Sequence, residues 1–125
     1  MDLDNFKNVN DTLGHEIGDQ LLIKTANQLV SIVKENDFVC RYGGDEFILI
    51  LETFKDDMEV KENAKKIIEA FREPIQIDGH SLKVTGSIGI SIYPDDGTNI
   101  ATLIKKADNA MYRIKRNGKN NFSSF

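Results

Sequence analysis

Apolar residues recur along this chain at two spacings, and each spacing predicts a different kind of element. Three stretches place apolar residues every three or four positions, the period of an amphipathic helix. They cover residues 19–34, 57–72 and 100–114. A shorter helix is expected over 5–10, with Asp4 in position to cap its first turn. The pattern therefore predicts four helices.

Strand patterns alternate with these helices. Residues 38–40 form a short strand-like run, and residues 47–51 are apolar at every position, which predicts a central strand covered on both faces. Apolar residues then alternate over 82–92, the period of a strand with one buried face. A short last strand can form at Phe122. The expected fold class is α/β, an α+β sandwich with a mainly antiparallel central sheet flanked by helices.

Glycines mark the turns between these elements. Gly43-Gly44 suits a two-residue hairpin turn with positive φ, and Asp78-Gly79 predicts a second hairpin. The polar stretch 14–19 begins with one glycine and contains another, so it is expected to be a loop. No repeat, low-complexity tract or linker interrupts the pattern, which predicts a single domain over residues 1–125.

Composition narrows the function classes. The net charge of −4 argues against a broad nucleic-acid surface but allows a small anionic ligand held by local cations or metal. The single cysteine, Cys40, excludes an internal disulfide and makes a reducing cytoplasm the simplest location. No apolar run approaches the roughly 20 residues that span a bilayer. The chain opens on acidic residues, so neither a signal peptide nor direct membrane insertion is expected.

Two acidic clusters are candidates for chemistry. One is Asp2-Leu3-Asp4, at an expected strand end, and the other is Asp45-Glu46, directly after the glycine pair. Hard cations such as Mg²⁺ take oxygen ligands, and one or two carboxylates together with substrate phosphates suffice. Two neighbouring strand ends could supply such a pair. Taken in isolation, however, an acidic hairpin tip is more simply explained by its contact with solvent.

A family signature surrounds the first predicted hairpin. The chain reads Arg41-Tyr42-Gly43-Gly44-Asp45-Glu46-Phe47 and so resembles the GGDEF family of diguanylate cyclases. Further stretches resemble the same family in the same order, at residues 2–11, 14–19, 87–91, 107–112 and 118–120. The resemblance covers essentially the whole chain. It implies a palm-like α/β domain related to nucleotidyl cyclases.

The resemblance also implies a metal-dependent active site. Asp2, the backbone carbonyl of Leu3 and Asp45 fall where the family binds one or two Mg²⁺ ions, with Mn²⁺ as an alternative. Glu46 or Asp45 falls where the family activates the 3′-hydroxyl of a bound GTP. Lys7 is placed to stabilise charge on the phosphates during transfer. These three side chains, Asp45, Glu46 and Lys7, are the expected catalytic residues.

Recognition of the guanine base is implied for a second group of residues. Asn10 and Asp19 fall where the family reads the guanine edge, and His15 falls at a position of substrate contact. The residue types suit the task, because a carboxylate accepts from guanine N1–H and N2–H₂ while an amide can pair with O6 or N3. Taken alone, His15 is better explained as a residue that stabilises its loop.

The phosphate side of the site is implied for two lysines and two glycines. Lys115 and Lys119 fall where the family holds the γ-phosphate, and the second position is often arginine. Lysine keeps that charge but loses the bidentate fork. Gly43 and Gly44 leave room for close approach of the nucleotide, since a side chain there would block it and strain the turn. In isolation, the lysines would be solvated residues near a helix C-terminus.

The chain departs from the family pattern in two places. Active members often carry an Arg-x-x-Asp product-inhibition site, but the matching stretch here runs from Lys34 to Asp37 and has no arginine. Weak or absent feedback by product is therefore expected. The family's first helix and most of its first strand are also missing ahead of Asp2. The domain is thus expected to be N-terminally truncated. We expect it to be poorly stable, self-associating or a fragment of a longer gene product, and less active than a version extended at the N-terminus.

Two function classes follow from the resemblance. The leading hypothesis is a diguanylate cyclase that condenses two GTP into the bacterial second messenger cyclic di-GMP as a homodimer. The alternative is a catalytically silent GTP-binding module that regulates an adjacent EAL phosphodiesterase domain. Either would be fused to sensor or EAL domains, which could tether it to a membrane. A generic metal-binding hairpin would leave the other motifs unexplained. The input signal and the parent architecture are not encoded in these residues.

Overall fold

Strands and helices alternate along the chain, and the computed structural model describes all residues, 1–125. The helices are α1 (Phe6–Leu13), α2 (His15–Ile32), α3 (Asp57–Ala70) and α4 (Ile100–Arg116). The strands are β1 (Asp2–Asp4), β2 (Phe38–Gly43), β3 (Glu46–Ile50), β4 (Ile75–Ile77), β5 (His80–Leu82), β6 (Thr85–Ile90) and β7 (Asn121–Ser124). None of the helices combines the length and apolar content needed to cross a membrane.

Five of the strands form one sheet in the order β2-β3-β1-β6-β7, while β4 and β5 form a separate hairpin. Every pair in the large sheet is antiparallel except β6 with β7, which is parallel. The predicted α/β class with a mainly antiparallel sheet is therefore confirmed. Strand β1 joins the two halves of the sheet, although it is only three residues long.

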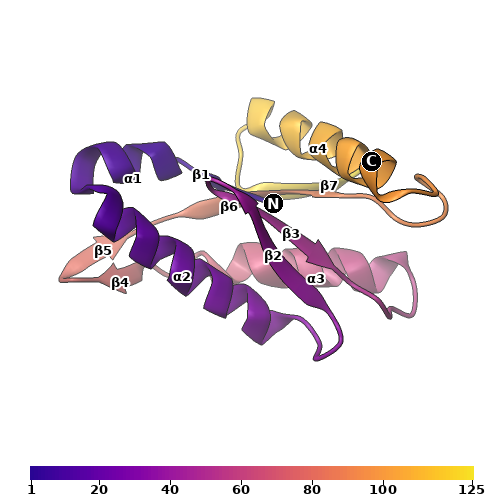
Figure 1. The fold of residues 1–125 in the computed structure, drawn as a ribbon, viewed down its shortest axis with the longest axis horizontal. Coiled ribbons are helices and arrows are strands. Elements are labelled where there is room, and N and C mark those ends of the chain that lie inside the picture. The colour runs from indigo at the N-terminus through magenta and orange to yellow at the C-terminus, as the bar shows by residue number, and fades with distance from the viewer.

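Helices lie on both sides of this sheet (Figure 1). On one side, the core gathers Ile88 and Ile90 of β6 with Ala64 and Ile67 of α3. On the other side, α4 approaches β6 at Gly89, where a Cβ atom would lie 1.8 Å from the carbonyl oxygen of Ala107. Glycine is thus required at this point of β6, because any side chain would push α4 away from the sheet.

Two local predictions near the N-terminus are wrong. Residues 14–19 were expected to be a loop, but α2 already begins at His15 and only Gly14, at φ +93°, turns the chain between the helices. Asp4 was expected to cap α1, yet the residue at the N-cap position is Asn5, with no side-chain cap. The carboxylate of Asp4 is occupied elsewhere, as described below, and tertiary contacts outweigh the local preference.

The first hairpin also differs from its prediction by one residue. The turn was expected at Gly43-Gly44, but Gly43 still pairs with Glu46, so the turn residues are Gly44 and Asp45. A register irregularity between Arg41 and Gly43 absorbs the extra residue. Only Gly44 has a positive φ, at +51°. The slip places Asp45 within the turn itself.

The long strand predicted over 82–92 is divided in the structure. Leu82 belongs to the β4–β5 hairpin, and β6 covers Thr85–Ile90. The alternation was nevertheless informative, because Val84, Ile88 and Ile90 are all buried. The predicted strand at Phe122 is present as β7.

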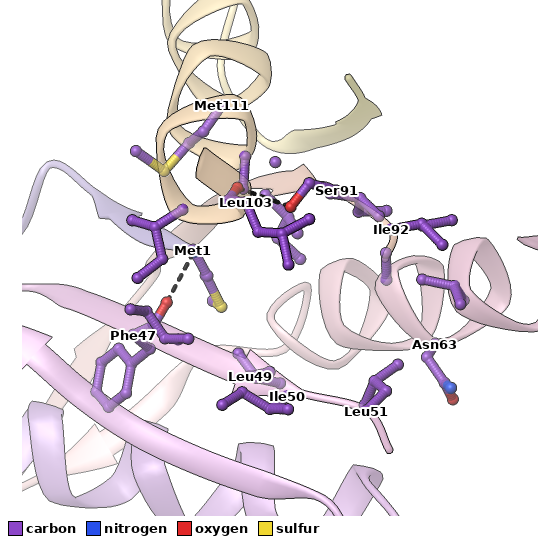
Figure 2. A pocket seen from close by; sticks show the side chains of 18 of the residues that line it. Met1, Phe47, Leu49, Ile50, Leu51, Asn63, Ser91, Ile92, Leu103 and Met111 are labelled. Atoms are coloured by element: carbon purple, nitrogen blue, oxygen red, sulfur yellow. Dashed lines mark hydrogen bonds between the residues drawn. The ribbon is translucent and has the colours of Figure 1, made fainter. Parts of the chain in front are cut away.

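The sheet has an open position beyond Met1. This residue exchanges two backbone hydrogen bonds of 2.8 Å with Phe47, which continues the β1–β3 register. Further along, β3 pairs only with β2 and β6 pairs only with β7. An apolar groove of about 860 Å³ lies there, lined by residues of β3, β6, α3 and α4 (Figure 2). The strand over 47–51 is therefore not covered on both faces, and Ile50 is 43% exposed.

A second feature fixes β1 to the rest of the fold. The side chain of Asp4 is 1% exposed, and its two oxygens accept four hydrogen bonds. The donors are the Thr85 hydroxyl at 2.7 Å, the Ser87 hydroxyl at 2.8 Å, the Lys115 ammonium at 2.6 Å and the Asn120 backbone N–H at 3.0 Å. These donors come from β6, from α4 and from the turn that follows α4. Asp4 thus ties β1 to three other segments.

The environment of Asp4 favours its charged form. Burial pushes the pKa of Asp4 upward, but the hydrogen bonds from Lys115, Thr85, Ser87 and Asn120 outweigh it and hold the pKa below its usual range. A carboxyl whose pKa is lowered by folding stabilises the fold above its unfolded pKa. That stabilisation is lost as the pH falls through the lowered pKa of the folded state.

The open sheet position leads to a first prediction. About four residues of alternating apolar pattern joined ahead of Met1 should pair with β3 from Ile48 onward and with β6 from Gly89 onward. Because backbone groups gain partners and apolar surface is covered, the thermal midpoint should rise by at least about 4 °C. Circular dichroism melting measures it. The control is an equal extension with alternate prolines, which cannot donate to a ladder. Equal midpoints for the two extensions would contradict the pairing.

The hydrogen bonds of Asp4 lead to a second prediction. Asp4→Asn should lower the free energy of unfolding at neutral pH by about 2–4 kcal/mol, because it removes a buried charge partner of Lys115. The difference from the native chain should shrink below about pH 4, where Asp4 of the unfolded chain is protonated. Urea unfolding at several pH values measures it. Asp11→Asn, at an exposed position, is the matched control. An equal loss in both variants would refute the role of Asp4.

Candidate active site

The acidic residues singled out in the sequence meet at one edge of the sheet. Asp2 lies in β1 directly opposite Glu46 of β3. The backbone N–H of Leu3 donates to the carbonyl oxygen of Asp45 at 3.2 Å, so the hairpin turn packs against β1. The structure therefore brings together four residues from two neighbouring strand ends, as the sequence predicted: Asp2, Leu3, Asp45 and Glu46.

The electrostatics of this edge are unfavourable to negative charge. Burial, and next the charge of Asp2, raise the pKa of Asp45 above its usual range. Burial also raises the pKa of Glu46, with further contributions from the charges of Asp108 and Asp2. Acids crowded in this way are poised to take up a cation, and perturbed pKa values of this kind are typical of functional sites.

Lys115 supplies a positive charge to the same edge. Its ammonium donates to Asp4 Oδ1 at 2.6 Å, lies 3.0 Å from Asp2 Oδ1 and is 3.5 Å from the carbonyl oxygen of Leu3. Burial lowers the pKa of Lys115, but the contacts with Asp4 and Asp2 outweigh it and raise the pKa overall. The side chain of Lys115 is 21% exposed, so its ammonium can be reached from outside.

Lys119 lies nearby in the turn after α4. Its φ is +62°, its backbone N–H donates to the carbonyl oxygen of Ile114 at 2.9 Å, and its ammonium donates to Asn5 Oδ1 at 3.3 Å. This contact joins the turn to the residue that links β1 to α1. The ammonium groups of Lys115 and Lys119 thus contact two consecutive residues, Asp4 and Asn5, at the end of β1.

The oxygens at this edge fit a hard cation. No group of three or more carboxylate, histidine or thiolate side chains is gathered as a complete cage. Asp2 and Asp45 are nevertheless two carboxylates on adjacent segments, and the carbonyl oxygen of Leu3 lies 3.5 Å from the Lys115 ammonium, which also contacts Asp2. Mg²⁺ commonly binds through one or two carboxylates plus substrate phosphates, and the mutual charge that raises the pKa of Asp45 is what a cation would relieve.

The residues expected to read the base lie on α1 and α2. The Asn10 side chain, from α1, lies against Gly18 of α2, whereas the next residue, Asp19, is exposed. His15 is exposed at the first residue of α2, and Lys7 is exposed in the first turn of α1. The structure thus places Asn10 at the contact between α1 and α2, while Asp19, His15 and Lys7 lie on the surface of the same two helices.

The glycines of the hairpin leave open space. A Cβ atom built at Gly43 or Gly44 would meet nothing within 4 Å. Packing inside the fold therefore does not explain either glycine. The positive φ of Gly44 is a conformation that other residues rarely adopt. Gly43 has no such constraint, so its small size matters only if something outside the chain approaches.

The stretch from Lys34 to Asp37 is engaged in local structure. The Lys34 ammonium pairs with Glu59 of α3 at 2.5 Å. Asp37 accepts from the backbone N–H of Lys34 at 2.9 Å and from that of Glu52 at 3.1 Å. These side chains hold the α2–β2 turn against its neighbours, so they are already used by the fold.

Sequence reasoning missed several residues of this region. Asp4 was interpreted as a helix cap, and the hydroxyls of Thr85 and Ser87 were not singled out. Ser87 is completely buried among apolar neighbours in β6, which was a sign that its hydroxyl has a specific partner. Asp108 of α4 also went unnoticed as a charge that acts on Glu46. No local pattern indicates that α4 reaches this edge of the sheet.

Known proteins resemble this chain along its whole length. Among curated proteins of Pseudomonas aeruginosa, it is 41% identical to the bifunctional diguanylate cyclase/cyclic di-GMP phosphodiesterase MucR, over 100% of this chain and 18% of MucR. It is 39% identical to the cyclic di-GMP phosphodiesterase NbdA, over 100% of this chain and 16% of NbdA. The chain thus spans less than a fifth of the length of these relatives.

Solved structures agree with the sequence comparison. The crystal structure of the GGDEF domain of TpbB (YfiN) from Pseudomonas aeruginosa superposes with a TM-score of 0.95 at 35% identity, over 98% of this chain and 77% of that one. The family described as "Diguanylate cyclase, GGDEF domain" matches residues 1–121. With nearly every residue inside that match, the chain belongs to the GGDEF domain family, as its hairpin signature predicted.

Proposed function

We propose that this domain is a diguanylate cyclase that condenses two GTP into cyclic di-GMP with Mg²⁺ or Mn²⁺. The observation that carries the proposal is the meeting of Asp2 and Asp45 on adjacent segments, with the Lys115 ammonium beside them. Two carboxylates and a cation at one partly exposed edge suit phosphoryl transfer, which depends on positioning and on neutralising phosphate charge. A role in cyclic di-GMP signalling agrees with the activities named for MucR.

The chain's own residues then have separable tasks. Asp2, Asp45 and the Leu3 carbonyl would hold Mg²⁺, which supplies charge neutralisation and orientation to the phosphates when bound. Asp45 or Glu46 takes the proton of the GTP 3′-hydroxyl. The O3′–Pα bond then forms as the bond from Pα to the leaving pyrophosphate breaks.

The remaining residues bind and orient the nucleotide. Lys115 and Lys119 would hold the γ-phosphate and Lys7 would stabilise charge during transfer. Asn10, Asp19 and His15 would contact the guanosine, while Gly43 and Gly44 admit it close to the backbone. A domain that holds one GTP needs a second domain to present the other, so catalysis requires a homodimer.

The alternative is a silent GTP-binding module that regulates an adjacent EAL phosphodiesterase domain. One observation favours it: NbdA, at 39% identity, is named as a phosphodiesterase alone. Against it stands the unbroken run Gly43-Gly44-Asp45-Glu46-Phe47 at the hairpin, since silent modules have no need of a complete acidic pair. Fusion to EAL or sensor domains is compatible with either function.

A product assay tests the proposed function. The chain is incubated with GTP and Mg²⁺, and linear and cyclic products are detected by mass spectrometry. Asp45→Ala should lower the rate of cyclic di-GMP formation by about a thousandfold or more, because metal and base are both impaired. Asp95→Ala, in an exposed loop, is the matched control and should keep the native rate. Unchanged product formation in Asp45→Ala would refute the assignment.

Thermal melting separates loss of chemistry from loss of fold in this assay. Burial and the nearby charge of Asp2 disfavour the Asp45 carboxylate, so its removal should leave the thermal midpoint unchanged or slightly raised. Mg²⁺-dependent GTP binding without any product would favour the silent regulatory module. Absence of GTP binding would count against both functions.

The engagement of Lys34 and Asp37 in the fold leads to a further prediction. Cyclic di-GMP titrated into Asp45→Ala by calorimetry should show no tight binding that depends on Asp37, because Asp37 already accepts two backbone hydrogen bonds. Lysine also lacks the fork that arginine offers to a guanine edge. Binding at about micromolar affinity or tighter that is lost in Asp37→Ala would overturn this expectation.

A further inference from the structure

A glycine in the second helix has an unusual setting. Gly18 is the fourth residue of α2 and is buried. Glycine is a poor helix former, so its presence inside a helix calls for a reason. The backbone is not the reason, because Gly18 is not among the glycines with positive φ. Its explanation must therefore lie in what packs against it.

The group that packs against Gly18 is the side chain of Asn10. A Cβ atom at Gly18 would lie 1.8 Å from Asn10 Oδ1 and 2.9 Å from Asn10 Cγ, with Phe6 Cζ at 3.4 Å. Any residue larger than glycine would thus occupy the place of the Asn10 carboxamide. The absence of a side chain at Gly18 is therefore what leaves space for the Asn10 carboxamide.

The carboxamide that fills this space has an unused hydrogen-bonding group. Asn10 Oδ1 is buried and has no hydrogen-bond partner within the chain. Buried polar atoms are paired in the great majority of cases, so an unpaired amide calls for an explanation. Here the packing against Gly18 holds the amide in place without a partner, and the residue that follows Gly18 is Asp19, the other residue expected to read guanine.

We propose that Gly18 is a positioning residue for nucleotide selectivity. By having no side chain, it keeps the Asn10 carboxamide between α1 and α2, where Asp19 is the next residue of α2. The inference rests on the proposed function, in which these two groups read a guanine edge. Gly18 itself does not touch the base. It acts through Asn10 alone, and this makes the idea testable by a double-mutant cycle.

The geometry also predicts how a larger residue would do harm. The atoms nearest the added methyl group belong to the end of the Asn10 side chain, which can rotate away, and not to backbone. Gly18→Ala should therefore fold, with the amide displaced from its place. Guanine presents an acceptor at O6 and donors at N1 and N2, whereas adenine does not, so a displaced amide should weaken GTP more than ATP.

The experiment compares the native chain with Gly18→Ala, Asn10→Ala and the double variant. GTP and ATP affinities are measured by calorimetry with Mg²⁺, and thermal midpoints by circular dichroism. Gly18→Ala and Asn10→Ala should each reduce the preference for GTP over ATP by about tenfold or more. The double variant should show no further loss beyond Asn10→Ala. In the Asn10→Ala background, where the space is free, Gly18→Ala should raise the thermal midpoint, because alanine is the better helix former.

Each other outcome has a distinct meaning. A native chain with no preference for GTP would overturn the proposed function itself. If Asn10→Ala loses the preference and Gly18→Ala keeps it, the positioning role is wrong while the guanine site survives. Fully additive losses in the double variant would also overturn the inference, because Gly18 would then act through something other than Asn10.

Discussion

The buried carboxylate of Asp4 is the interaction on which the rest of this site depends. Strand β1 is three residues long, and its pairing with β3 involves a single strand residue, Asp2 opposite Glu46. Such a short strand has little hold on its neighbours from backbone pairing alone. Four hydrogen bonds to Asp4 add side-chain anchors on β6, α4 and the turn beyond it. Because Asp2 is two residues away on the same strand, whatever fixes Asp4 also fixes the acidic edge.

The carboxyl groups around β1 are of two kinds, and their environments shift the carboxyl pKa in opposite directions. Asp4 is supplied with donors, and its pKa is lowered. Asp45 and Glu46 are partly buried among other acids, and their pKa values are raised. The first arrangement stabilises the fold, while the second stores unfavourable charge that a cation or a proton can relieve. Lys115 contacts Asp4 and also Asp2, whose charge contributes to the raised pKa of Asp45 and Glu46, and so links the two arrangements.

Periodicity predicted the elements well and their ends poorly. The long helices, the mainly antiparallel sheet and the buried face of β6 follow from repeating apolar positions, which report burial directly. The errors lie where a tertiary contact overrides a local preference. Gly18 was taken for a loop residue, yet it sits inside a helix because Asn10 packs on it. Asp4 was taken for a cap, yet donors more than 80 residues away engage it. The approach of Asp2 to Asp45 could be expected because both lie at strand ends. The contacts of Lys115 with Asp2 and Asp4 could not, because they depend on where α4 runs relative to β1. The chemical roles of these residues stay predictions.

The two halves of the candidate site are held in place by different contacts. Substitutions in each half are therefore expected to have different effects on stability. The acidic edge belongs to a sheet and depends on charge balance around β1, so changes there alter stability and reactivity together. The half proposed to read the base belongs to α1 and α2, which meet at Gly18 through the Asn10 amide and the Phe6 ring. A small displacement of that amide leaves the core packing of both helices in place. Under the proposed function, nucleotide selectivity can therefore change with little change in the fold, whereas the acidic edge cannot be altered so independently.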